Sequence, residues 1–124
     1  MVPRQQELSR DWAEELMTVH VSWPLPRSVA IRVCGEVDLC TVPRLEQELR
    51  RRIRGPVDEV LVDLSRVSFL AVAGLGCLLR AQEDADERGI PLYIDRGDSR
   101  AVNRVFTLLR DTLPARFSMP VPRG

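Results

Sequence analysis

The chain has 124 residues, which suits one compact domain, and its 18 basic residues balance its 18 acidic ones. The zero net charge argues against a general electrostatic attraction to nucleic acid or to an anionic membrane surface. Every basic residue is arginine, so no lysine is present for Schiff-base or amine catalysis.

The first half of the chain predicts an arm, two strands and a helix. Residues 1–15 are polar and compatible with a short helix. "LMTVHVSW" and "VAIRVCGEV" alternate apolar and polar residues and predict a hairpin across a proline-containing loop. "TVPRLEQELRRRIRG" predicts a helix, with Thr41 as its N-terminal cap and Pro43 in its first turn. His20, the single histidine, falls on the polar side of the first strand, where we expect a surface residue.

The second half predicts two further strands and two further helices. "VDEVLVDLSRV" is almost continuously apolar, as in a strand covered on both faces. "GLGCLLRAQEDADERG" predicts a helix, "IPLYIDR" a strand, and "DSRAVNRVFTLLRD" a helix capped by Asp98 or Ser99. The order β-β-α-β-α-β-α indicates an α/β fold in which helices cover a small mixed sheet. Residues 16–112 are predicted to form this domain, and residues 113–124 a tail.

Few residues in the chain could carry catalysis or bind a metal. Three cysteines, Cys34, Cys40 and Cys77, lack zinc-like spacing and are interpreted as reduced core residues, with a Cys40–Cys77 redox pair as the alternative. Asp38 and Asp63 end up near strand termini without a histidine, cysteine or lysine partner, and Asp63 is expected to be a hydrogen-bonded structural residue. We therefore expect no enzymatic activity, no cofactor and no metal.

The location expected for the protein is the cytoplasm. No apolar run approaches the length of a membrane-spanning helix, and the N-terminal segment lacks the apolar core of a secretory signal. The predicted protein is therefore not inserted in a membrane.

The stretch "SFLAVAGLG", residues 68–76, joins a predicted strand to a predicted helix. In an open α/β sheet, the carboxyl end of a strand is a common place for function. Here, however, the stretch presents Ala71, Val72, Ala73 and Gly74, none of which has a polar side chain. A functional role at this position would have to depend on shape and apolar contact.

Four segments, "GEVDLCTVPRL", "VLVDLSRVSFL", "AGLGCLLRA" and "RAVNRVFTLL", resemble in order and separation the STAS domain, especially that of bacterial anti-sigma-factor antagonists. The resemblance covers residues 16–112. It implies docking onto an ATP-binding anti-sigma factor that is also a serine kinase, which displaces the sigma factor and so regulates transcription. The partner-binding residues that it implies are Asp38, Leu39, Thr41, Ala71, Val72, Ala73, Gly74, Leu75 and Gly76.

The resemblance also shows a departure from the family's phosphorylation motif. In that family the junction reads Asp-Ser-Ser-Gly or Asp-Thr-Ser-Gly, and phosphorylation of its first hydroxyl residue breaks the complex. Here Ala71 replaces the aspartate and Val72 replaces the phosphoacceptor, while Gly74 is retained. We therefore expect an antagonist without the usual phosphorylation switch. Ser68 and Thr41 are substitute acceptors to consider, although a strand end and a helix cap are their more ordinary roles.

Two other functions stay open from the sequence. One is an accessory STAS subunit that docks on the ATPase of a transport system. The other is a small-molecule or nucleotide sensor with a pocket near Asp38 and residues 71–76. The loss of the acidic residue at position 71 also leaves room for a partner other than the family's kinase.

Overall fold

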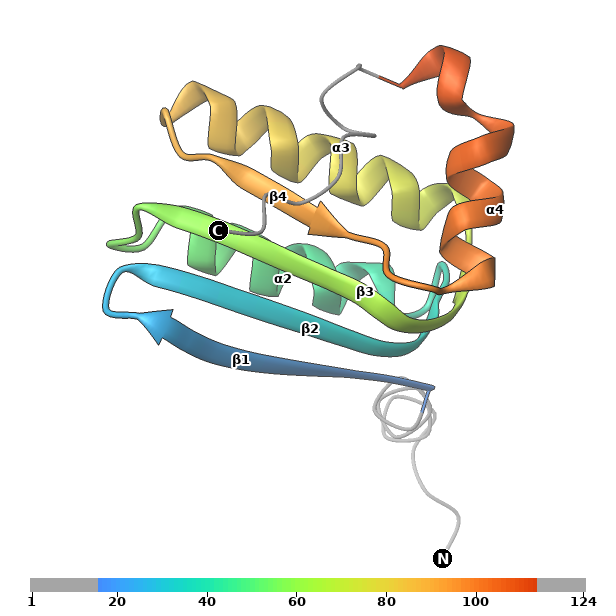
Figure 1. The fold of residues 1–124 in the computed structure, drawn as a ribbon, viewed down its shortest axis with the longest axis horizontal. Coiled ribbons are helices and arrows are strands. Elements are labelled where there is room, and N and C mark those ends of the chain that lie inside the picture. Colours follow the sequence, from blue (N-terminus) through green and yellow to red (C-terminus); the bar gives the residue numbers. More distant parts are fainter. Residues whose placement is uncertain (1–15, 114–124) are drawn as a thin grey trace, which may run out of the picture.

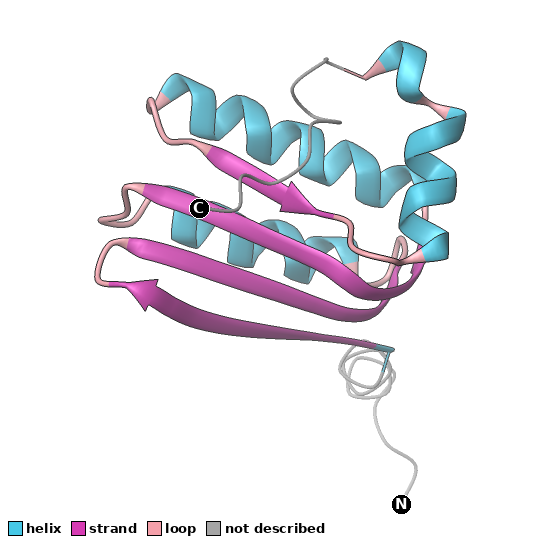
Figure 2. Cartoon of the chain, viewed as in Figure 1, coloured by secondary structure: helices cyan, strands magenta, loops and turns pink. Residues whose placement is uncertain are grey.

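The computed structural model describes residues 16–113, which form one four-stranded sheet with three α-helices and a short 3-10 helix. The predicted element order and α/β class are confirmed (Figure 1, Figure 2). The elements are β1 (Met17–Leu25), β2 (Ser28–Val37), α2 (Val42–Ile53), β3 (Glu59–Leu70), α3 (Val72–Glu87), β4 (Leu92–Asp95), α4 (Arg100–Leu108) and the 3-10 helix Arg110–Thr112. The arm predicted for residues 1–15, and residues 114–124 of the predicted tail, lie outside the described residues.

The sheet is mixed, and its strands follow the order β1-β2-β3-β4. β1 pairs with β2 in an antiparallel hairpin, whereas β2, β3 and β4 are parallel to one another. Helices α2 and α3 lie side by side against one face of the sheet, and α4 lies at the end where β3 and β4 terminate (Figure 1). The carboxyl ends of the parallel strands therefore share one edge of the molecule.

The core lies between the sheet and helices α2 and α3. On β2 and β3, alternate residues are fully buried, because successive side chains of a strand point to opposite faces. The apolar stripe predicted for α2 is also buried against this core. The residues concerned are Val29, Ile31 and Val33 on β2, Val60, Val62 and Leu64 on β3, and Val42, Leu45, Leu49 and Ile53 on α2.

The expectation that β3 is covered on both faces is wrong for the middle of the strand. Its burial alternates, and Leu61 and Asp63 remain half-buried on the face opposite the core. The sequence is continuously apolar here because Leu61, which is half-buried, lies between two buried valines. The sequence pattern alone cannot distinguish a half-buried leucine from a fully buried one. No helix within residues 16–113 has both the length and the apolar character needed to cross a bilayer.

Two strands are longer than the sequence suggested. β1 continues through Pro24 to Leu25, which is possible because β1 is an edge strand and a missing N–H there breaks no interior ladder. β3 continues to Leu70, so the predicted turn shrinks to Ala71 alone.

Of the two residues predicted to cap α4, Ser99 is the cap: its hydroxyl accepts a hydrogen bond from the Val102 N–H at 3.2 Å.

Candidate functional site

The β2–α2 turn and the β3–α3 junction lie next to each other at one end of the sheet. β2 and β3 are parallel neighbours, and Val37 is paired with Leu70 at their carboxyl ends. The Ala71 N–H donates a hydrogen bond to the Val37 carbonyl at 2.8 Å, which ties the two connections together. Side chains from residues 38–41 and from the start of α3 therefore belong to one surface.

The β2–α2 turn is held by hydrogen bonds among its own residues. The Asp38 carboxylate accepts hydrogen bonds from the Cys40 N–H at 2.9 Å and the Thr41 N–H at 3.1 Å. The Thr41 hydroxyl accepts a hydrogen bond from the Asp38 N–H and donates one to the Glu36 carbonyl, both at 2.9 Å. Asp38 thus has a structural task in the turn, whatever else its exposed part contacts.

Thr41 differs from its expected roles. Its side chain is completely buried and makes no capping hydrogen bond to helix α2. The hydroxyl points back into the turn, because the Glu36 carbonyl and the Asp38 N–H compete for it more effectively than the helix N-terminus does. Thr41 is the N-cap residue of α2 by position, but the prediction that its side chain caps the helix is wrong; its contact with a partner stays a prediction.

Helix α3 begins without a side-chain cap. Ala71 is its N-cap residue, with extended backbone angles of φ −77° and ψ 160°, and its side chain has no oxygen to accept a hydrogen bond. Its carbonyl accepts hydrogen bonds from the Gly74 N–H at 2.9 Å and the Leu75 N–H at 3.2 Å. An Asp, Ser or Thr would normally satisfy one of the free N–H groups in the first turn.

Gly74 allows α3 to sit directly on the strand ends. A Cβ atom at this position would lie 2.7 Å from Cδ1 of Leu70 and 2.7 Å from Cγ1 of Val37. Gly74 itself is buried, and the next residue, Leu75, is only 3% exposed and belongs to the core. Both residues position the surface from below, and the expected contact of each with a partner stays a prediction.

Three large apolar side chains are exposed at this end of the sheet. Leu39 is 78% exposed on the β2–α2 turn, Val72 is 72% exposed in the first turn of α3, and Phe69 is 49% exposed at the end of β3. We call these three residues, with half-buried Ala71 and Ala73, the junction surface. Of the other predicted contact residues, Asp38 and Gly76 are half-buried.

Phe69 was missed by the sequence analysis. The β2–β3 register shifts between Gly35 and Glu36, so Ser68 is an extra residue on β3 and both Ser68 and Phe69 are exposed. Such a bulge redirects side chains at the end of a strand. The sequence did contain a signal for its exposure: Phe69 is an aromatic residue that breaks the apolar–polar alternation of the strand just before the β3–α3 junction.

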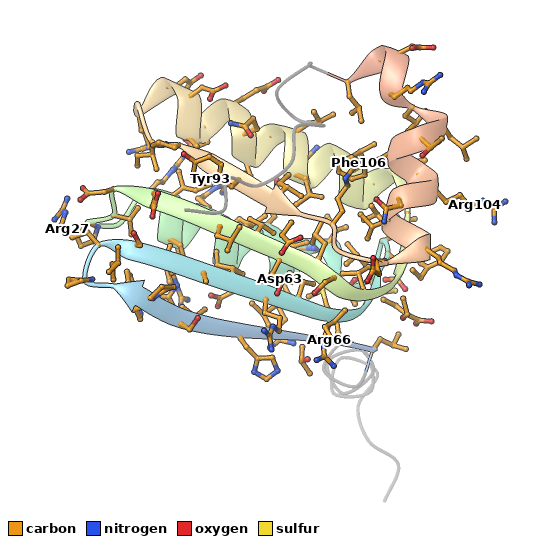
Figure 3. The ribbon with its side chains drawn as sticks, viewed as in Figure 1. Arg27, Asp63, Arg66, Tyr93, Arg104 and Phe106 are labelled. Atoms are coloured by element: carbon orange, nitrogen blue, oxygen red, sulfur yellow. The ribbon has the colours of Figure 1, made fainter. Side chains whose placement is uncertain are left out.

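The titratable groups with shifted pKa values lie outside the junction surface. Asp63 is in the middle of the sheet (Figure 3) and accepts hydrogen bonds from the Ser65 N–H at 2.9 Å and hydroxyl at 2.6 Å. Burial raises its pKa, but these bonds and Arg32, at 3.3 Å, outweigh burial and leave the pKa below its ordinary value. Asp63 is thus a hydrogen-bonded structural residue, as expected.

The three cysteines are free in the structure, and they occupy different environments. Cys40 is exposed on the β2–α2 turn, Cys34 is intermediate, and Cys77 is buried in helix α3. Burial raises the pKa of Cys77 to about 11, so its thiol is protonated near neutral pH. A Cys40–Cys77 redox pair is therefore not supported, since one of its two thiols is inaccessible.

A groove of about 240 Å³ separates the outer sides of α2 and α3. Its walls carry charged side chains, and two ion pairs cross the groove: Arg80 with Glu46 at 2.9 Å and Arg54 with Asp84 at 3.3 Å. These partly exposed ion pairs join the two helices across the groove, whose lining also includes Leu49, Ile53, Cys77 and Ala81. Among residues 16–113, no group of three or more His, Cys, Asp or Glu side chains could hold a metal ion.

Residues 24–110 match the family model described as "Mlab, STAS domain". The anti-sigma-B factor antagonist of Staphylococcus aureus is 31% identical over 78 residues, which cover 63% of this chain and 71% of that protein. An anti-sigma factor antagonist from Mycobacterium paratuberculosis has a similar solved structure, with 29% identity, a TM-score of 0.63 and coverage of 79% of this chain and 83% of that chain. Unphosphorylated SpoIIAA, at 22% identity and a TM-score of 0.63, shares the fold over 73% of this chain and 79% of its own. Because the family model spans most of its length, this chain belongs to the STAS domain family.

Proposed function

We propose that this protein is an anti-sigma factor antagonist whose junction surface binds an anti-sigma factor of the ATP-binding serine-kinase type. Binding displaces the sigma factor and so regulates transcription, in the cytoplasm, without contact between this chain and nucleic acid. The observation that carries the proposal is Val72, which is 72% exposed at the position that resembles the family's phosphoacceptor. The similarity to named anti-sigma factor antagonists favours this function over a transport subunit or a small-molecule sensor.

The junction surface is suited to burial against another protein. Full burial of a valine or leucine side chain is worth about 1.5–3 kcal/mol, and Val72 and Leu39 are both mostly exposed in the free chain. Ala71 and Ala73 beside Val72 have no polar side-chain atoms, so covering them with a partner carries little desolvation cost. Interfaces of this kind have an apolar centre from which charged residues are depleted.

The same chemistry removes the usual switch. A phosphate would add about −1.5 to −2 charges to this surface, and that charge would be desolvated in the complex. Residues 71–73 have no hydroxyl to accept it. Of the two substitutes that the sequence offers, Thr41 is buried with its hydroxyl bonded to the Glu36 carbonyl, whereas Ser68 is exposed. Ser68 is therefore the remaining acceptor to test.

The docking test is calorimetry with each purified serine-kinase anti-sigma factor from the same cell. We expect wild-type chain to bind one of them and to release its sigma factor. Val72→Asp should weaken binding by about tenfold or more, because it replaces an apolar contact by a charge in the interface. The fold should survive, since an acidic side chain in the first turn of a helix is favourable.

Leu25→Asp is the matched control. Leu25 is also an exposed apolar side chain, at 62%, but it lies on the β1–β2 hairpin at the opposite end of the sheet (Figure 1). It should leave affinity unchanged. Equal affinities of wild-type and Val72→Asp chains, or no binding to any such anti-sigma factor, would contradict the proposal.

The switch is tested separately, by mass spectrometry after incubation with the bound kinase and ATP. Wild-type chain should gain no phosphate at residues 71–73, whereas the double variant Ala71→Asp with Val72→Ser should gain one and then lose affinity. Phosphate on Ser68 of the wild-type chain, with loss of binding, would show that the switch has moved rather than disappeared. That result would leave the docking proposal intact.

A further inference from the structure

The two edges of the sheet differ in how well they are protected against pairing with another strand. β4 has four residues, is preceded by Pro91 and is followed by Arg96, all of which discourage strand addition. β1 has nine residues, "MTVHVSWPL", and His20 is the one ionisable side chain among them. Within residues 16–113, no second strand pairs with the outer side of β1 (Figure 1).

The residues Thr18 to Ser22 form a chemical palindrome centred on His20. Read in either direction, the order is hydroxyl, valine, imidazole, valine, hydroxyl. This segment is also the regular part of the strand, because β1 pairs with β2 without interruption from Met17 to Ser22 and becomes irregular only afterwards. An uninterrupted strand offers its outer backbone N–H and C=O groups in the regular alternation that an added antiparallel strand requires.

The polar residues and the valines of the palindrome lie on opposite faces of the sheet. Thr18, His20 and Ser22 are exposed on the face opposite the core, whereas Val19 and Val21 are half-buried on the core side. If a second copy added its β1 in antiparallel orientation about a two-fold axis perpendicular to the sheet, polar residues would meet polar residues and valines would meet valines. A sequence that is self-complementary about one residue is what an interface between identical chains needs.

We propose that two copies of this chain associate through antiparallel pairing of their β1 strands, with His20 at the two-fold axis. Thr18 would then lie opposite Ser22 of the second copy, and Val19 opposite Val21. The pairing ends before Met17, whose carbonyl already accepts a hydrogen bond from the Arg44 guanidinium at 2.9 Å. The two sheets become one continuous sheet, and their junction surfaces lie at opposite ends, free to bind partners.

The experiment introduces like or opposite charges on the two sides of the proposed axis and measures the dimer dissociation constant by sedimentation equilibrium. One chain carries Thr18→Glu with Ser22→Glu, and the other carries Thr18→Arg with Ser22→Arg. We expect wild-type chain to dimerise in the high micromolar range. Each variant alone should have a dissociation constant raised by about tenfold or more, because like charges directly oppose each other. An equimolar mixture of the two variants should form heterodimers.

The control is Gln47→Glu with Thr107→Glu, which adds the same charge at exposed positions on α2 and α4. It should dimerise like the wild type. Heterodimer formation also reports that both charged variants are folded, and His20→Glu gives the same test if a double variant fails to fold. A monomeric wild type, dimers unaffected by either variant, or a mixture that stays monomeric would each overturn the proposal. A wild-type monomer that still binds the anti-sigma factor would leave the proposed function untouched.

Discussion

Replacing Gly74 by alanine tests whether helix α3 is seated directly on the strand ends. The added Cβ would lie 2.7 Å from Leu70 and 2.7 Å from Val37, whose side chains are packed in the core. Inserting a methyl group into a packed core costs about 1–3 kcal/mol. Against this, alanine gains about 0.8–1.0 kcal/mol over glycine in a helix. Gly74→Ala should therefore lower the free energy of unfolding by about 0–2 kcal/mol.

Gly76→Ala separates the two contributions, because it makes the same change two residues later in the same helix. Its Cβ would meet only the end of the Arg80 side chain, at 3.4 Å. This variant should gain helix propensity without the clash, so the two variants should differ by about 1–3 kcal/mol. The measurement is urea unfolding followed by far-ultraviolet circular dichroism.

The same pair of variants links stability to binding. We expect α3 to shift away from the packed side chains of Val37 and Leu70 to relieve the clash at Gly74, and that movement displaces Val72 relative to Leu39. Gly74→Ala should therefore weaken binding of the anti-sigma factor more than Gly76→Ala does. If the two variants were equally stable, the close approach of α3 to the strand ends would be refuted.

Ala71→Asp should raise the free energy of unfolding by about 0.5–2 kcal/mol, because it supplies the missing hydrogen-bond acceptor at the start of α3. An unchanged melting temperature would contradict the assignment of Ala71 as the N-cap residue. Iodoacetamide at about pH 8 should label Cys40 quickly and Cys77 only on unfolding, as read by mass spectrometry; rapid labelling of Cys77 in the folded chain would contradict its burial. Burial raises the pKa of Cys77 from 9.0 to about 11, so its contribution to stability is complete below pH 9 and is lost as the pH rises through 11. Cys77→Ala should therefore reduce the loss of stability measured in that alkaline range.

The element order was predictable because it depends on local periodicity. The stripe of Val42, Leu45, Leu49 and Ile53 identifies α2 without knowledge of any other element, and the structure buries all four residues. Strand ends depend instead on partners far away in sequence. β3 extends to Leu70 because β2 is available to pair with it as far as Val37, and no feature of residues 68–70 alone reports this.

The site was predictable as a location but not as a set of exposed side chains. The stretch around residues 71–76 does meet the β2–α2 turn, as parallel strands require. Which residues face outward depends on three-dimensional packing: Leu75 is taken into the core, Thr41 is held by its own turn, and Phe69 is turned outward by a bulge. The functional contacts themselves stay predictions.

The free chain carries two unfavourable features at the same corner, and a bound partner would remove one of them. The start of α3 lacks a capping oxygen, and Val72 and Leu39 expose apolar surface to water. Serine or aspartate at position 71 would improve the isolated domain, so stability of the free chain does not account for alanine there. A partner that buries this corner removes the exposed apolar area from water. Burial of a hydroxyl or a carboxylate at position 71 would cost more desolvation free energy than burial of alanine does. Ala71→Asp should accordingly act in opposite directions on the two measurements, by raising the stability of the free chain and lowering its affinity for the anti-sigma factor.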